Sequence, residues 1–87
     1  MALEQTASGE WTGEYVNFEE LGILNGQKTN RWEVADKYGY SLGVVRWFSR
    51  WRKYAFYPRD LCVFEETCLR DIAQFIEERT RDHKAKG

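Results

Sequence analysis

Residues 46–59 read Arg-Trp-Phe-Ser-Arg-Trp-Arg-Lys-Tyr-Ala-Phe-Tyr-Pro-Arg and carry most of the structural information in this 87-residue chain. The window holds five of the thirteen Lys and Arg residues, six of the fourteen aromatic residues and the single proline, and it has no acid. Aromatic and β-branched side chains are typical of strands. Cations interleaved with aromatic rings also suit a surface that neutralises phosphates and stacks on bases. The window therefore predicts both a part of a sheet and a binding surface.

Short runs around this window have the spacing of antiparallel strands. Residues 31–35 alternate between apolar and more polar side chains, and residues 44–48 and 54–57 are rich in β-branched and aromatic residues. Residues 39–40 (Gly-Tyr) and 49–50 (Ser-Arg) fall where two-residue turns would join these runs, and a glycine in the first position suits a type II′ turn. We therefore expect two consecutive hairpins.

The expected register divides the side chains between two faces. Tyr38 would pair with Ser41 across the first turn, and Phe48 with Trp51 across the second. One face would collect Trp32, Val34, Val45, Trp47, Tyr54 and Phe56, and the other Glu33, Ala35, Lys37, Leu42, Val44, Arg46, Lys53, Ala55 and Tyr57. A slip of one residue would mix the two sets, so the division supports this register.

Two further elements are expected on either side of the hairpins. A strand over residues 15–18 precedes them if Gly26 is left-handed in a three-residue loop at 24–26. Towards the C-terminus, apolar residues at i, i+3, i+4 and i+7 predict an amphipathic helix. This stripe consists of Leu69, Ile72, Ala73 and Ile76, flanked by Cys68, Phe75 and Arg79. Before the helix we favour a short edge strand over residues 61–64, with a helix start at Asp60 as the alternative.

These elements predict an α+β fold, in which an antiparallel meander of three or four strands carries one C-terminal α-helix packed on its aromatic face. We expect this single domain to occupy residues 14–80. Residues 1–13 are small and polar apart from Trp11 and predict a disordered N-terminal tail. Residues 81–87 predict a charged C-terminal tail.

Charge is distributed unevenly along the chain, although the formal net charge is only −1. Five acids and one base give residues 1–30 a charge of −4, seven bases and three acids give residues 31–60 +4, and residues 61–87 carry −1. The basic middle predicts a surface that faces an anion or an acidic partner. No apolar run approaches the ~18 residues that span a bilayer, and no signal-peptide pattern begins the chain. We therefore expect a cytoplasmic protein with no role in a membrane.

Nothing in the sequence has the pattern of a catalytic or metal site. The chain lacks a G-x-S-x-G motif, a glycine-rich phosphate loop and a His/Cys cluster at metal-binding spacing. Cys62 and Cys68 are expected to be free thiols, with a disulfide or a metal site as the alternative, and the single histidine, His83, lies in a charged segment. We therefore expect neither enzyme activity nor a cofactor.

The candidate ligand-binding residues lie on the sheet face opposite the helix and at the tip of the second hairpin. Arg46, Lys53 and Tyr57 would occupy the open face, and Arg50, Trp51 and Arg52 the tip. Arg46 and Lys53 would stand directly opposite each other, a repulsion that either Glu33 or a bound anion could relieve. A stacking ring among cations is typical of surfaces that bind single-stranded nucleic acid or nucleotides.

Two other interpretations of the same surface stay open. Val44, Ala55 and Tyr57, ringed by cations, could form an interface with a protein partner or with a second copy of the chain. Alternatively, Trp51 caps the end of the core, and the surface cations prevent pairing at the sheet edges. The near-neutral net charge favours a protein partner, whereas the local cluster of cations favours an anion.

Three segments of the chain form a specific pattern. They are L-G-x-V-x-W at residues 42–47, W-R-x-Y-x-F-x-P at residues 51–58 and C-L-x-x-I-x-x-F at residues 68–75. The pattern resembles that of small uncharacterised proteins of bacteriophages and prophages, over about Phe18 to Ile76. The resemblance implies a short accessory protein in the bacterial cytoplasm, of a kind that commonly acts by stoichiometric binding, including inhibition of a host defence protein. It implies no site residues.

Overall fold

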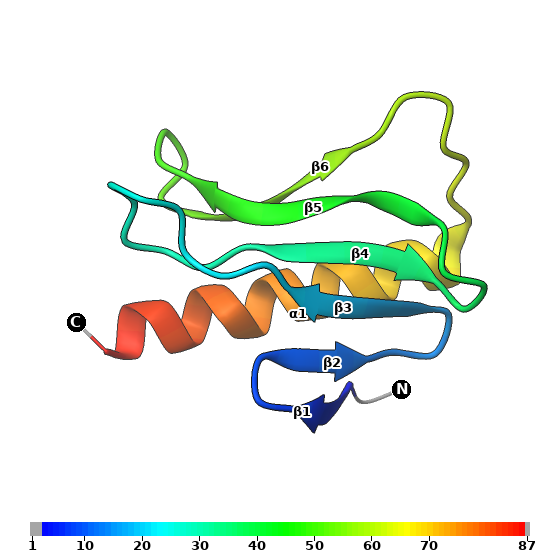
Figure 1. The fold of residues 1–87 in the computed structure, drawn as a ribbon, viewed down its shortest axis with the longest axis horizontal. Helices are drawn as coiled ribbons and strands as arrows, with labels where there is room; N and C mark the ends of the chain where they lie inside the picture. The colour runs from blue at the N-terminus through cyan, green and yellow to red at the C-terminus, as the bar shows by residue number, and fades with distance from the viewer. Residues whose placement is uncertain (1–2, 87) are drawn as a thin grey trace.

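The computed structural model describes residues 3–86 as an antiparallel sheet with one helix across one of its faces (Figure 1). In chain order, the strands are β1 (Glu4–Ala7), β2 (Glu10–Thr12), β3 (Val16–Glu20), β4 (Trp32–Asp36), β5 (Ser41–Phe48) and β6 (Lys53–Pro58), and the helix is α1 (Glu66–Ala85). Each strand pairs with the next along the chain, so the sheet is a six-stranded meander. The predicted α+β meander with a C-terminal helix is confirmed, but the predicted number of strands is wrong.

The two additional strands, β1 and β2, lie where a disordered tail was predicted. Leu3 is buried in the core, and the ring of Trp11 in β2 meets Phe75 of α1 edge-on, with 6.2 Å between centroids. The sequence conceals these strands because so few apolar side chains anchor an otherwise polar segment. Residues 1–2 of that predicted tail lie outside the described residues. Residue 87, at the end of the predicted charged C-terminal tail, also lies outside them. The part of that tail up to Ala85 belongs to α1.

Both predicted hairpin registers are wrong by two residues. Trp32 pairs with Val45 rather than with Trp47, and Val45 pairs with Phe56 rather than with Tyr54. Side chains alternate with a period of two along a strand, so a slip of two returns each side chain to the same face. The predicted division of side chains between two faces is therefore preserved for most of these residues. Leu42 is an exception: it was predicted on the open face, but it packs against the buried core beside an irregularity in the β4–β5 pairing.

The registers shift because both turns are wider than two residues. Oδ1 of Asp36 accepts hydrogen bonds from the backbone N–H groups of Tyr38 and Tyr40, at 2.9 and 3.0 Å, so the β4–β5 turn wraps around this carboxylate. In the β5–β6 hairpin, Arg52 has φ 55 and its N–H donates to the carbonyl of Phe48 at 3.0 Å. Local hydrogen bonds of this kind compete successfully with the tighter turns.

The strand predicted before the hairpins is present as β3. Gly26 is left-handed as expected, with φ 83, in a turn closed by a 2.9 Å hydrogen bond from the N–H of Gln27 to the carbonyl of Leu24. The connection from β3 to β4 is nevertheless much longer than a three-residue loop. It spans residues 21–31 and is called the β3–β4 loop below.

The helix covers the aromatic face of the sheet, as predicted (Figure 1). The buried hydrophobic core consists of Leu3, Val16, Phe18, Trp32, Val34, Val45, Tyr54, Ile72 and Phe75. The ring of Phe75 stacks on Phe18 with centroids 4.0 Å apart and meets Trp32 edge-on at 5.2 Å. Leu69 and Ala73, predicted to belong to the apolar stripe, are exposed. The helix is therefore rotated so that Phe75, rather than Leu69, points into the core.

The helix begins at Glu66 because Glu65 caps it. The Glu65 side chain accepts a 2.7 Å hydrogen bond from the backbone N–H of Cys68, which satisfies one of the free donors of the first turn. This hydrogen bond to the charged form lowers the pKa of Glu65. The edge strand predicted over residues 61–64 does not form, and Leu61 instead adopts a left-handed conformation with φ 63.

Asp71 ties the helix to the sheet. Its side chain is buried, and Oδ2 accepts hydrogen bonds from the backbone N–H groups of Tyr15 and Val16, at 2.7 and 3.3 Å. A buried carboxylate is stable when such donors replace its water. Asp71 therefore fixes where α1 crosses the beginning of β3.

Candidate functional site

A row of aromatic rings crosses β5 and β6 on the sheet face opposite α1. The ring of Phe48 meets Trp51 edge-on with centroids 4.7 Å apart, and its centroid lies 6.4 Å from that of Tyr57. The guanidinium of Arg46 lies over the Tyr57 ring, 4.7 Å from its centroid. We call Trp51, Phe48, Tyr57 and Arg46 the aromatic row. Rings and a cation in this order can stack bases and contact phosphates.

The structure brings three of the predicted site residues, Arg46, Trp51 and Tyr57, into the aromatic row. Arg50 and Arg52 are exposed in the loop that carries Trp51, which is itself 63% exposed. Phe48, the residue that joins the row together, was missed. Strand alternation places it on the same face as Arg46, and that signal could have identified it.

Lys53 does not occupy the position that the sequence predicted. Arg46 pairs with Ala55, and Lys53 pairs with Phe48 at the end of the hairpin. The predicted repulsion between Arg46 and Lys53 is therefore wrong, and it offers no argument for a bound anion. Lys53 instead lines a hollow of about 270 Å³ between β6 and α1.

Charge on this open face changes sign across the sheet. Glu19 of β3 pairs directly with Glu33 of β4, so two carboxylates face each other on the acidic half. Glu33 in turn pairs with Val44 of β5, beyond which lies the aromatic row. A polyanion would be repelled by the β3–β4 half and attracted by the β5–β6 half.

A groove runs between the β3–β4 loop and the C-terminal half of α1. One part of the groove has a volume of about 350 Å³, and its lining includes Lys28, Trp32, Tyr54, Arg79, His83 and Lys86. A second part, of about 340 Å³, also involves Lys28, Thr29 and His83 and extends to Trp47 and Ser49. We call these two connected parts the C-terminal groove. The sequence does not reveal this groove, because its walls come from segments far apart in the chain.

The C-terminal groove belongs to a larger basic end of the molecule. A hollow of about 70 Å³ lies between the β3–β4 loop and β5, and the hollow that Lys53 lines lies between β6 and α1. The groove and these two hollows are lined by eight cations, Lys28, Arg31, Arg46, Lys53, Arg79, Arg81, Lys84 and Lys86, and by two acids, Glu77 and Asp82. The β3–β4 loop, the β5–β6 hairpin and the C-terminus of α1 lie at one end of the sheet (Figure 1). The fold thus concentrates positive charge that the net charge conceals.

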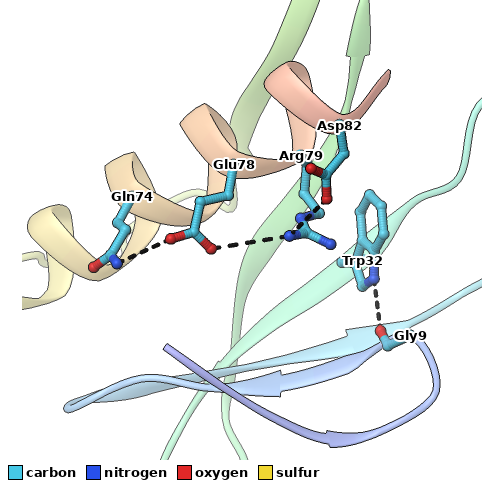
Figure 2. A network of polar contacts seen from close by, with 6 residues as sticks. All are labelled: Gly9, Trp32, Gln74, Glu78, Arg79 and Asp82. Atoms are coloured by element: carbon cyan, nitrogen blue, oxygen red, sulfur yellow. Dashed lines mark hydrogen bonds and ion pairs between the residues drawn. The ribbon is translucent and has the colours of Figure 1, made fainter. Parts of the chain in front are cut away.

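Arg79 forms part of the groove wall and is held by its neighbours. Figure 2 shows this side chain beside Trp32, where α1 passes over the sheet. Its guanidinium lies 3.2 Å from a carboxylate oxygen of Asp82 and 3.9 Å from one of Glu78. The indole N–H of Trp32 donates to the carbonyl of Gly9 at 2.7 Å (Figure 2). Two carboxylates offset the charge of Arg79, so the exposed lysines remain as the cations of the groove.

Two titratable groups bear on the chemistry of the surface. Burial raises the pKa of the Tyr54 hydroxyl, which is protonated at neutral pH even without this shift. Burial likewise raises the pKa of the Cys68 thiol, which makes it a poor nucleophile. Cys62 and Cys68 are both free.

Residues 3–86 contain neither a metal-binding cluster nor a membrane-crossing helix. No group of three or more His, Cys, Asp or Glu in this range is placed to hold a metal ion. Nor is any helix in the same range long and apolar enough to cross a membrane.

Comparison with known proteins connects the chain to a phage protein. It is 31% identical, over 72 residues, to a protein of Acholeplasma phage L2 described as an uncharacterized 9.3 kDa protein. The matched region is 82% of this chain and 91% of the relative. No protein-family model matches the chain, and no solved structure matches it significantly.

The similarity extends over most of both chains, so it includes most of the sheet and helix. The chain therefore belongs to the family of small phage proteins that includes this relative. The expected resemblance to small phage proteins is confirmed at that level. The three-segment pattern, as a signature of the group, stays a prediction.

Proposed function

We propose that this protein is a non-catalytic binding domain for single-stranded nucleic acid, with a nucleotide as the smallest form of the same ligand. The observation that carries the proposal is the aromatic row, in which Arg46, Tyr57, Phe48 and Trp51 form a continuous series of ring and cation contacts. Successive bases stack on such rings without regard to sequence, and the neighbouring cations contact the backbone.

The charges on the open face favour the same ligand and indicate which strands of the sheet it would follow. The aromatic row adjoins the basic end of the molecule, whereas Glu19 and Glu33 occupy the other half of the open face. A strand would therefore follow β5 and β6 and avoid β3 and β4. Arg50 and Arg52, exposed on either side of Trp51, would contact phosphates at the tip of the hairpin.

Fluorescence anisotropy of labelled oligonucleotides tests the proposal. The wild-type protein should bind a single strand more tightly than the matching duplex, with affinity that falls steeply as salt rises. Trp51→Ala should weaken binding by about 5- to 150-fold, because stacking contributes about 1–3 kcal/mol per base. Tyr38→Ala is the matched control, since Tyr38 is 89% exposed in the β4–β5 turn at the opposite end of the sheet. Equal affinities of the two variants would contradict a stacking role for Trp51.

A second candidate function rests on a different surface. Tyr15, Tyr38, Tyr40, Leu61, Val63 and Leu69 are all exposed. They belong to the β2–β3 turn, the β4–β5 turn, the segment after β6 and the first turns of α1, which lie at the end of the sheet away from the β5–β6 hairpin (Figure 1). Leu61 is 99% exposed and left-handed, a conformation that costs a non-glycine residue about 1–2 kcal/mol. Exposed apolar patches of this kind commonly bind proteins.

This second surface favours the alternative of a phage accessory protein that binds and inhibits a host protein, for example one of a defence system. Such a protein would act in the cytoplasm of the bacterial host, and the same patch could join two copies of the chain. Leu61→Ser combined with Val63→Ser should abolish capture of a host protein, or dimerisation in sedimentation, while oligonucleotide binding is retained. If this double variant instead lost oligonucleotide binding and still captured the host protein, a protein-binding role for this end of the sheet would be excluded.

A further inference from the structure

We propose that the C-terminal groove continues the nucleic-acid site, so that one single strand passes from the aromatic row around the β5–β6 hairpin to the helix side of the sheet. This inference rests on the proposed function and adds a second contact surface to it. It also selects a strand of several nucleotides, rather than a mononucleotide, as the ligand.

Trp47 connects the two surfaces. It follows Arg46 in β5, and both residues line the hollow beside the β3–β4 loop. Trp47 also lines the C-terminal groove, where its ring centroid lies 4.4 Å from that of His83. Trp47 therefore lines both spaces on the path from Arg46 to the groove, and the polar side chains of Gln27 and Thr29 line both as well.

The groove has the size and polarity that a nucleotide unit needs. Its two parts, of about 350 and 340 Å³, are each within the range of about 300–1,000 Å³ that holds small ligands. Lys28 and Lys86 stand on opposite walls, one in the β3–β4 loop and one at the end of α1. Neither lysine forms an ion pair with another of the residues 3–86. The side chain of Tyr54 also lines the larger part of the groove.

The position of the groove argues against an isolated small anion as its ligand. It lies at the C-terminal end of α1, where the helix dipole is negative and disfavours anions. Lys28 and Lys86 offset the negative potential of the helix end, but the groove would still bind a small anion only weakly. A strand already held at the aromatic row would occupy such a weak site efficiently, because the second contact becomes intramolecular.

Binding of two oligothymidylates by the full chain tests the inference. One probe has about 15 nucleotides and one about 4, near the limits of the range of about 4–16 nucleotides covered by small single-strand-binding domains. Lys28→Ala combined with Lys86→Ala should weaken binding of the long probe about 25-fold at about 0.1 M salt. Each phosphate contact on a single strand adds about 0.7 to the slope of log affinity against log salt concentration, so two contacts add about 1.4. Relative to 1 M salt, where such contacts contribute little, this slope amounts to about 25-fold at 0.1 M salt. Binding of the short probe should be unchanged.

The matched control removes two cations elsewhere. Arg59→Ala with Arg70→Ala changes the net charge by the same amount in the segment between β6 and α1 and in the first turns of α1. This control should leave both affinities near the wild-type values, and melting temperatures of all variants should agree. Equal losses in the lysine variant and the control would overturn the inference, because net charge alone would then explain them.

Two further outcomes distinguish the groove from the proposed function. If the wild-type protein binds both probes and the lysine variant is unaffected, the groove is not part of the site while the aromatic row remains. If the wild-type protein binds neither probe, both proposals are overturned. Displacement of the long probe by polyglutamate at equal charge would also overturn the inference, and would point to an acidic protein segment.

Discussion

Replacement of Asp71 by alanine should destabilise the protein more than any other removal of a carboxylate. The Asp71 side chain is 4% exposed and accepts two backbone hydrogen bonds, from Tyr15 at 2.7 Å and Val16 at 3.3 Å. Hydrogen bonds to a charged acceptor contribute about 1.5–3 kcal/mol each, and burial of the carboxylate offsets part of that gain. We therefore expect a loss of about 3 kcal/mol, which in a domain of this size lowers the melting temperature by about 12–24 °C.

Thermal and urea unfolding, followed by circular dichroism, measure this effect. Asp71→Asn keeps an acceptor oxygen but loses the charge, and should cost about 1 kcal/mol. Glu77→Ala is the control, because Glu77 is an exposed acid of the same helix and its removal should change stability by no more than about 0.5 kcal/mol. A melting temperature for Asp71→Ala within about 3 °C of wild type would refute the conclusion that Asp71 ties α1 to β3.

The other predictions concern close packing, pH and the binding surface. Gly43→Ala should cost about 3 kcal/mol or more in urea unfolding, because φ is 153 and an added Cβ would lie 2.3 Å from the carbonyl oxygen of Tyr57; a near-wild-type midpoint would contradict this close approach. Glu65→Gln should lower the melting temperature at neutral pH. The pKa of Glu65 is lower in the folded than in the unfolded protein, so its carboxylate stabilises the folded state above the unfolded pKa. This stabilisation is lost as pH falls through the folded pKa, and the melting temperatures of wild type and Glu65→Gln should therefore converge in acid. Arg46→Ala with Lys53→Ala should lower the melting temperature by no more than about 8 °C, since an exposed cation–π contact contributes about 0.5–1 kcal/mol, while oligonucleotide affinity falls; a larger drop would make these residues structural.

The face assignment could be predicted from the sequence, whereas the pairing of strands could not. Trp32, Val45 and Phe56 form one cross-strand set in the structure, and the predicted register placed each of them on the same buried face with other partners. Periodicity reports the face of a side chain, but it is unaffected by a slip of two residues. The actual register depends on hydrogen bonds inside the turns, such as those to Asp36, which composition does not show.

The helix illustrates the same limit. Its presence and its contact with the aromatic face follow from amphipathic spacing, but its start, its end and its rotation do not. Leu69 is 49% exposed, while Phe75 is fully buried between Phe18 and Trp32. The shape of the space above the sheet decides which helical residue enters it, and a large flat ring that stacks on Phe18 is favoured there.

Some residues of the candidate site could likewise be predicted from the sequence. The sequence of residues 46–59 predicts that Arg46 and Tyr57 share one face, because side chains alternate along a strand, and it predicts Trp51 at the tip of the hairpin between them. Phe48 could have been found by the same rule.

Local sequence therefore accounts for the class of fold, the helix on the aromatic face and the aromatic character of the open face, since these depend on short-range periodicity. Tertiary structure alone accounts for the six strands, the role of Asp71 and the basic end. Lys28 and Arg46 lie there because the meander returns every second turn to the same end of the sheet, and Lys86 lies there because α1 runs back across the sheet to that end (Figure 1). Net charge is a sum over the chain, whereas a binding surface depends on which charges the fold places side by side.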